Sequence, residues 1–189
     1  MTFAPDIEAS LKTVVNLLNT EVQIVDMLST VADLDEFLDA ENFDGSRAHN
    51  QAELRSIRQL RSQLKNIWIG TEEESVFRVN AILRNANAQP QLIKSESLGY
   101  HLHATTNSTP LYDRMAVDAA MALAEVIRSG GLQRLRICAS EDCEAALLDL
   151  SRNRSKLYCD TGNCANREHV RAYRARKASK RSGQQQPAS

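Results

Sequence analysis

The sequence predicts a mainly α (α+β) fold, in which a helical N-terminal domain with a small β-hairpin precedes a small cysteine-rich domain. Apolar residues recur at helical spacing through the first 130 residues, whereas all four cysteines follow them. Charge divides at the same place. Residues 1–130 hold 11 basic and 18 acidic side chains, net −7, and residues 131–189 hold 12 and 6, net +6. The formal net charge of −1 is therefore a sum over two unlike parts.

Composition excludes several classes of protein. With 42% hydrophobic and 25% charged residues, the chain is neither disordered nor fibrous. No run of roughly 18 apolar residues predicts a membrane span, and the first residues lack the basic start of a secretory signal. We therefore expect a cytoplasmic protein that contacts no membrane. Its thiols would be reduced, so paired cysteines indicate metal rather than disulfides.

Several helices are expected in the first 130 residues. Apolar spacing predicts a first helix from about Asp6 to Asn19. Asp33 and Glu36 are spaced as a capping box before a short second helix. A longer helix carries apolar residues from Leu54 to Trp68 on one face and ends at Gly70. Two further helices begin at the capping box Thr71-x-x-Glu74 and at Pro110, and Gly130-Gly131 ends the last of them.

One stretch of the first 130 residues alternates between apolar and polar residues instead. Gln91–Ser95 and Leu98–Thr105 predict a short hairpin with Leu98, Tyr100, Leu102 and Ala104 on one side. His101 and His103 then fall on the polar side, which we interpret as solvated rather than as a pair of metal ligands.

Three units follow from these patterns. Residues 1–130 form the helical domain, residues 131–177 a zinc finger, and residues 178–189 a disordered tail rich in Ser, Gln, Lys and Arg. The glycine pair Gly130-Gly131 marks the boundary between the first two units.

The four cysteines form two equally spaced pairs, Cys138/Cys143 and Cys159/Cys164, with fifteen residues between the pairs. Two such pairs can bring four sulfurs to one Zn²⁺ in a tetrahedron. Zinc also meets an energetic need, because so few large apolar side chains could scarcely fold this segment unaided. The sequence predicts one structural zinc, since four protein ligands leave no position for a catalytic water. Two disulfides or four unrelated thiols are the alternatives.

The segments around the cysteines predict the shape of this domain. Apolar stretches flank Ser151–Ser155, which suits the tip of a hairpin between the two pairs. A helix follows Cys164, with Arg167, Arg171 and Arg174 on one face; Val170 and Tyr173 would pack on the hairpin. A knuckle, a hairpin and a helix that supplies the last ligand form a treble-clef-like zinc finger.

Here the sequence resembles a known family. The four cysteines, the run Asp149-x-Ser151-Arg152-Asn153-Arg154-Ser155 and the pair Asn166-Arg167 resemble the CGNR zinc finger. Ala165 replaces the glycine of that motif, Tyr158 its tryptophan, and Glu168-His169 stands where a lysine is common. Leu17-Leu18-Asn19-Thr20 and Asp33-Leu34-x-x-Phe37-Leu38 are similar, more loosely, to the helical ABATE domain that usually precedes this finger. The resemblance implies a transcriptional regulator related to stress responses.

The basic residues of the finger predict a DNA-binding surface. A stripe of arginines can neutralise phosphates, release counterions and read guanine edges. Four thiolates and one Zn²⁺ add −2, which leaves a net charge of about +4. Docking on an acidic protein surface, including the acidic domain of this chain, and plain solvation are the alternatives. The candidate nucleic-acid-binding residues are Arg152, Arg154, Lys156, Arg167, Arg171, Arg174, Arg176 and Lys177.

Two further assignments compete at the start of the last helix. Asp149 and Arg167 are predicted as a structural pair between hairpin and helix, in which case Arg167 does not contact DNA. His169 lies beside the arginines and is a less favoured fourth zinc ligand.

The function expected is DNA-binding transcriptional regulation, with DNA and zinc as partner and cofactor. The helical domain would be a sensor for a small-molecule effector, a homodimerisation unit, or both, although no polar group of a ligand pocket can be named. A protein-interaction or thiol redox-sensing module is the alternative. We expect no enzyme and no catalytic residue, because the chain has no nucleophile elbow, P-loop, dinucleotide fingerprint or metal-hydrolase motif.

Overall fold

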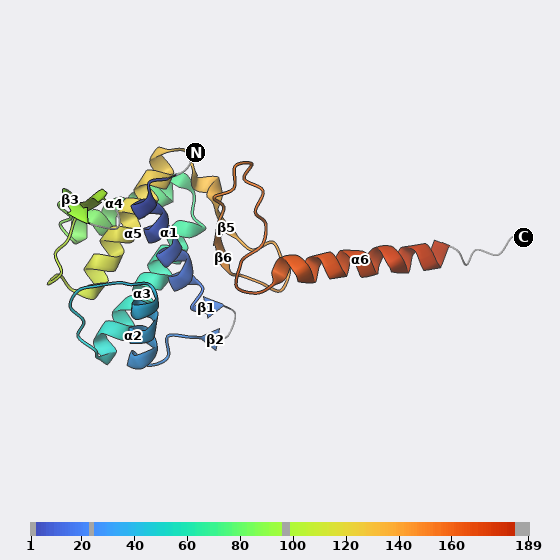
Figure 1. Ribbon diagram of the computed structural model, residues 1–189, viewed down its shortest axis with the longest axis horizontal. Helices are drawn as coiled ribbons and strands as arrows, with labels where there is room; N and C mark the ends of the chain where they lie inside the picture. Colours follow the sequence, from blue (N-terminus) through green and yellow to red (C-terminus); the bar gives the residue numbers. More distant parts are fainter. Residues whose placement is uncertain (1–2, 23–24, 96–98, 184–189) are drawn as a thin grey trace, which may run out of the picture.

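A computed structural model describes residues 3–22, 25–95 and 99–183. It confirms the mainly α fold with small antiparallel hairpins (Figure 1). Within the described residues, no helix is long and apolar enough to cross a membrane. The helices are α1 (Pro5–Leu18), α2 (Val31–Ala40), α3 (Gln51–Trp68), α4 (Glu72–Asn85), α5 (Leu111–Arg128) and α6 (Cys164–Gly183). The strands are β1 (Glu21–Val22), β2 (Val25–Asp26), β3 (Gln91–Ser95), β4 (Gly99–His103), β5 (Leu135–Ile137) and β6 (Ala146–Leu148).

Helix α5 lies at the centre of the helical domain and packs against α1, α3 and α4. Its inward face is apolar at helical spacing, as the sequence predicts, and Leu123 is fully buried. Leu11 of α1 and Ile57 of α3 are equally buried in the same core. Burial of such aliphatic side chains stabilises this domain by about 1.5–3 kcal/mol each.

The helix starts follow the capping rules, with one correction. Thr71 and Glu74 form the predicted capping box at the start of α4. At α2, however, the box is Thr30 with Asp33, not Asp33 with Glu36. A threonine hydroxyl three residues earlier accepts from the Asp33 N–H, so the helix begins before the predicted cap.

A short β1–β2 hairpin after α1 was not predicted, because each strand has only two residues. Polar contacts to α3 fix it in place. Asp26 accepts from both Arg58 and Arg61, and Arg61 Nη1 also donates to Thr20 Oγ1 at 2.9 Å. The Arg61 guanidinium is thereby buried with its charge paired.

The predicted β3–β4 hairpin is present, but its faces are reversed. Tyr100 and Leu102 point outward, 69% and 52% exposed, while His101 and His103 turn toward the helices. Because side chains alternate along a strand, the whole face is fixed together, and here α1 and α5 present polar groups to it. Ala104 is buried, and Leu98 lies outside the described residues.

The finger begins on the helical domain rather than after a linker. Gly130 takes a positive φ of 61° just beyond the end of α5, and a short 3₁₀ turn leads into β5. Strand β6 then shares its side chains between two clusters: Ala146 and Leu148 join the helical core, and Leu147 joins the cysteines.

Helix α6 projects away from the rest of the molecule as a single long rod (Figure 1). Val170 and Tyr173 are 41% and 60% exposed, so the prediction that they pack on a hairpin is wrong. The helix also continues to Gly183, six residues into the tail that the sequence predicts as disordered, since its Ala, Lys and Arg residues favour helix. Residues 184–189 of that tail lie outside the described residues.

A candidate metal centre and its basic helix

The four cysteines converge from three local structures. Cys138 directly follows β5, Cys143 lies in the connection to β6, Cys159 lies in the loop between β6 and α6, and Cys164 opens α6. Their sulfur atoms all lie within 4.8 Å of one another, and in the described chain no other cluster of potential metal ligands is found.

The spacing of the sulfurs fits zinc. A tetrahedron with Zn–S bonds of about 2.3 Å has edges of about 3.8 Å. The Sγ atom of Cys159 lies 3.7 Å from that of Cys143 and 3.6 Å from that of Cys164. All four cysteines are free of disulfides, and three are buried. The predicted ligands therefore form one structural zinc site, closed by four thiolates.

Backbone turns hold the sulfurs in this arrangement. The Cys143 N–H donates to the Ser140 carbonyl at 3.0 Å, which closes the turn between the first two ligands. The Cys159 N–H points at Cys138 Sγ, 3.4 Å away. Gly162 passes so close that a Cβ there would lie 2.9 Å from Cys164 Sγ, so a side chain would displace a ligand.

The thiols differ in acidity before metal binds. Burial raises the pKa of Cys143 to about 12. Burial acts the same way on Cys159, but hydrogen bonds from Thr161 and the Gly162 N–H outweigh it and lower that pKa to about 7. A metal must displace the remaining protons, because only the thiolate is a zinc ligand.

The hairpin of the finger encloses the first cysteine pair instead of separating the two pairs. Strands β5 and β6 pair across Cys138–Cys143, with Leu135 opposite Leu148. Residues 149–163, predicted to contain a hairpin tip, form an irregular loop. Arginines that sequence reasoning did not single out hold its backbone: Arg134 donates to the Asp149 and Ser151 carbonyls, and Arg136 to those of Arg154 and Lys156.

The predicted pair between Asp149 and Arg167 does not form. The fully buried Asp149 carboxylate accepts from Ser151 and from the Lys156 N–H, and Arg136 lies 3.6 Å away. Burial alone would raise its pKa, but these donors lower it below the usual value. Arg167 instead donates from Nη2 to Cys164 Sγ at 3.2 Å, because the first turn of α6 brings it back over the ligand.

The remaining candidate DNA contacts fall into two groups. Lys156 pairs with Asp160 at 2.6 Å, and Arg171 is bound by Asp142 and Glu168. Further along α6, Arg174, Arg176 and Lys177 are exposed, as are Arg152 and Arg154 in the loop. Across the described chain, the side chains of these five have no hydrogen-bond or ion-pair partner.

The histidines take no part in the metal site. His169 is exposed on α6, outside the group of sulfur ligands. The ring nitrogen Nδ1 of His49 lies 3.0 Å from the Asp35 carboxylate. His101 and His103 line a cleft in the helical domain.

Comparisons with known families agree with this architecture. The model described as "CGNR zinc finger" matches residues 134–177, and the model described as "Putative stress-induced transcription regulator" (ABATE) matches residues 11–130. No curated protein matches the chain.

Proposed function

The chain belongs to the ABATE family and carries a CGNR zinc finger, and from this premise we propose that it is a cytoplasmic, non-enzymatic transcription regulator that binds DNA through the finger. The helical domain serves as the sensor of a small-molecule effector, or as the contact between two copies of the chain. Zinc holds the basic loop and α6 in one orientation.

The observation that carries the proposal is the free basic length of α6. Its sequence contains seven basic residues and one acid, and the helix extends clear of the acidic domain (Figure 1). A helix of 20 residues is about 30 Å long, enough to follow several phosphates along a duplex. A basic face docked on the acidic half of the chain would instead be paired, which Arg174, Arg176 and Lys177 are not within the described structure.

The predicted contacts differ in how freely their charges could bind phosphate. Arg174, Arg176, Lys177, Arg152 and Arg154 offer free cations to phosphates. Arg171 and Lys156 would first have to leave their carboxylate partners, which weakens any contact they make. Arg167 stabilises the zinc ligand Cys164, so its replacement would act on the metal site rather than on DNA directly.

The test compares two triple variants of the zinc-loaded full chain. Arg174→Ala/Arg176→Ala/Lys177→Ala removes the free cations of α6, and Lys12→Ala/Arg55→Ala/Arg84→Ala removes three exposed cations from the helical domain. Fluorescence anisotropy with duplex DNA, from about 50 to 200 mM salt, measures affinity and its salt slope. We expect the α6 variant to lose roughly 2.7 from the slope, about 0.9 per phosphate contact, and the control variant to keep it.

Two results would contradict the proposal. Equal losses in the two variants would make the binding a matter of overall charge. If zinc-loaded protein does not bind duplex DNA at about 50 mM salt, DNA is not its partner. That result would favour the protein-interaction or redox-sensing alternative.

A further inference from the structure

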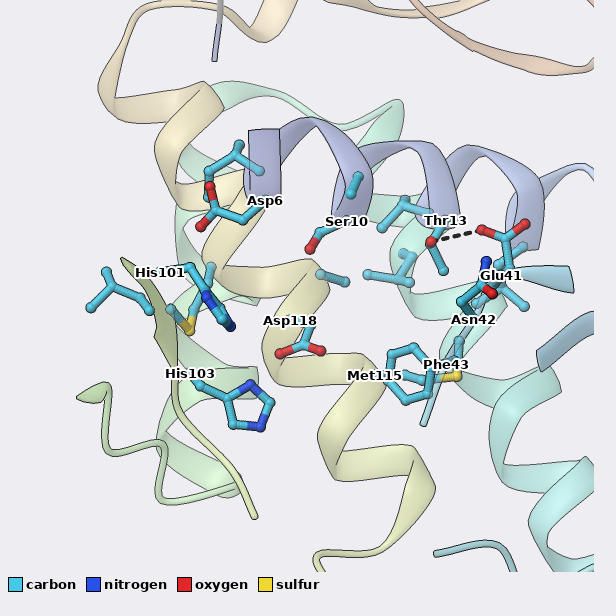
Figure 2. Close-up of a pocket in the computed structure, with 18 residues that line it drawn as sticks. Asp6, Ser10, Thr13, Glu41, Asn42, Phe43, His101, His103, Met115 and Asp118 are labelled. Atoms are coloured by element: carbon cyan, nitrogen blue, oxygen red, sulfur yellow. Dashed lines mark hydrogen bonds between the residues drawn. The ribbon is translucent and has the colours of Figure 1, made fainter. Parts of the chain in front are cut away.

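A cleft in the helical domain has the composition of a ligand site. It encloses about 250 Å³ between α1, α5, strand β4 and the segment after α2. Sequence reasoning could name no polar group there, because these groups come from four separate segments. The polar side chains that line it include Asp6, Ser10, Thr13, Glu41, His101, His103 and Asp118 (Figure 2).

Asp118 is the central polar group of this cleft. Figure 2 shows Asp118 in the middle of the lining, with Ser10 of α1 above it, His101 and His103 on one side and Phe43 and Met115 on the other. No donor in the described part of the chain hydrogen-bonds to it. Desolvation raises the pKa of Asp118, while the nearby His103, Arg114 and His101 lower it by their charges. A half-buried carboxylate without a donor is costly, and a ligand that donates to it would remove that cost.

Two other charged groups near the cleft already have partners. Glu41 already accepts from Thr13 and Asn16, each at 2.7 Å. Arg114 is directed elsewhere, since its guanidinium donates to the carbonyls of Asp44, Ser46 and Thr109. The lining therefore holds three carboxylates, two imidazoles and neither lysine nor arginine.

The charges of this lining favour a positively charged organic ligand. An anion would meet the carboxylates of Asp6, Glu41 and Asp118 with no cation in the lining to balance them. A metal ion would need three converging ligand atoms, and among the described residues only the four cysteines supply them. An organic ammonium group can donate to the Asp118 carboxylate, and its carbon part can lie against the apolar lining residues Phe43 and Met115.

We propose that this cleft binds a small organic cation, a primary amine with a short apolar group, whose ammonium is held by Asp118. The cleft is smaller than the roughly 300–1,000 Å³ of sites that hold drug-sized ligands, so the ligand is a small one. The inference rests on the sensing role of the proposed function and gives it a site and a ligand class.

The test is calorimetric titration of the zinc-loaded full chain with three probes, methylammonium, butylammonium and benzylammonium. Benzyl alcohol and benzoate are the neutral and anionic counterparts of the last. We expect benzylammonium to bind about tenfold more tightly than benzyl alcohol, the difference that one charge-assisted hydrogen bond makes, and benzoate not to bind.

Two variants assign the effect to the carboxylate. Asp118→Asn keeps the shape of the side chain and should abolish the preference for the ammonium over the alcohol. Asp113→Asn, on the same helix but outside this cleft, should keep it. Thermal unfolding of both variants checks that each is folded.

The proposal is overturned if the alcohol binds as tightly as the ammonium, if Asp118→Asn keeps the preference, or if no amine binds at millimolar concentration. The anisotropy assay on the same preparation separates this failure from that of the proposed function. Loss of amine binding with DNA binding intact removes only the cleft as the ligand site. Amine binding without DNA binding would contradict the proposed regulator function and would support the amine site in the cleft.

Discussion

The helical domain and the zinc finger are stabilised by different forces although they share a strand. The helical core consists of fully buried aliphatic side chains such as Leu11, Ile57 and Leu123. The finger has its own buried cluster, but three of its five members are zinc ligands, with Ala145 and Leu147. We therefore expect apolar burial to stabilise the first region and zinc to stabilise the second.

The shared strand shows how two such regions can be joined without a linker. Ala146 and Leu148 of β6 point into the helical core, and Leu147 between them points to the cysteines. Trp68 Nε1 of α3 also donates to the Arg136 carbonyl of β5 at 2.9 Å. The β5–β6 hairpin is therefore anchored on the stable region, and the metal organises the loop and the helix beyond it.

Removal of zinc should have the largest effect and should separate the two regions. Structural zinc contributes about 10–16 kcal/mol in isolated finger peptides, so the metal-free finger should lose its fixed structure. Hydrogen exchange with and without a chelator measures this. We expect the Ala139 and Arg167 amides to lose protection and the amides of α5 to keep it.

Cys159→Ser tests the same effect without a chelator and should reproduce the pattern at saturating zinc. Equal loss of protection in α5 would show that the two regions unfold as one unit, and the helical domain would then depend on the metal as much as the finger does.

Disruption of the ion pair between Asp26 and Arg61 in the helical domain should have the next largest effect. Asp26 accepts from Arg61 at 2.8 and 3.0 Å, and these bonds hold its pKa well below the usual range. A carboxyl whose pKa is lowered by folding stabilises the protein at pH values above its unfolded pKa of about 3.9. This stabilisation is lost as the pH falls toward the pKa of the folded state. Asp26→Asn should therefore cost about 3 kcal/mol at pH 7 and much less in strong acid.

Urea unfolding at several pH values measures that loss. Asp39→Asn is the matched control, because the Asp39 carboxylate also pairs with an arginine but is 72% exposed. The control should cost under about 1 kcal/mol at any pH. A pH-independent loss in Asp26→Asn would mean that packing, not charge, holds the β1–β2 hairpin.

The sequence predicts features that depend on local patterns better than features that depend on contacts between distant segments. Helix positions follow from the spacing of residues such as Leu11 and Leu123, and the metal site from the repeated cysteine spacing, because both signals are local. The inward face of β4 could not be predicted, since it depends on Asp118 of a distant helix. The partner of Asp149 was missed for the same reason: Arg136 reaches it only once β5 pairs with β6.

The pair Asn19-Thr20, on which the resemblance of the N-terminal domain partly rested, acquires a physical role here. Thr20 accepts from the buried Arg61, which fixes the β1–β2 hairpin. Asn19 bonds both backbone groups of Ala146: its Nδ2 donates to the carbonyl at 3.0 Å, and its Oδ1 accepts from the N–H at 2.8 Å. Thr20 thus connects α1 to the β1–β2 hairpin and its contact with α3, and Asn19 connects α1 to strand β6.

Asn19→Ala should have the smallest of these effects and the most specific one, because it leaves both regions intact and loosens their contact. Two half-buried backbone groups would lose their partners, at a cost of about 1–2 kcal/mol. Asn16→Ala is the control one turn earlier, where the lost bond is an exposed one to Glu41. Urea unfolding with and without zinc measures the coupling as a thermodynamic cycle.

We expect zinc to stabilise α5 less in Asn19→Ala than in the parent chain, since Asn19 joins α1 directly to strand β6, beside the metal site. The same helix leads to the cleft, whose wall includes Ser10 and Thr13 of α1. If occupancy of the cleft alters DNA binding, α1 is the shortest connection, and Asn19→Ala should reduce that coupling while leaving both affinities measurable. Unchanged coupling in the variant would place the connection elsewhere, for example at the Trp68 contact to Arg136 or at Val22, which packs against the cysteine cluster.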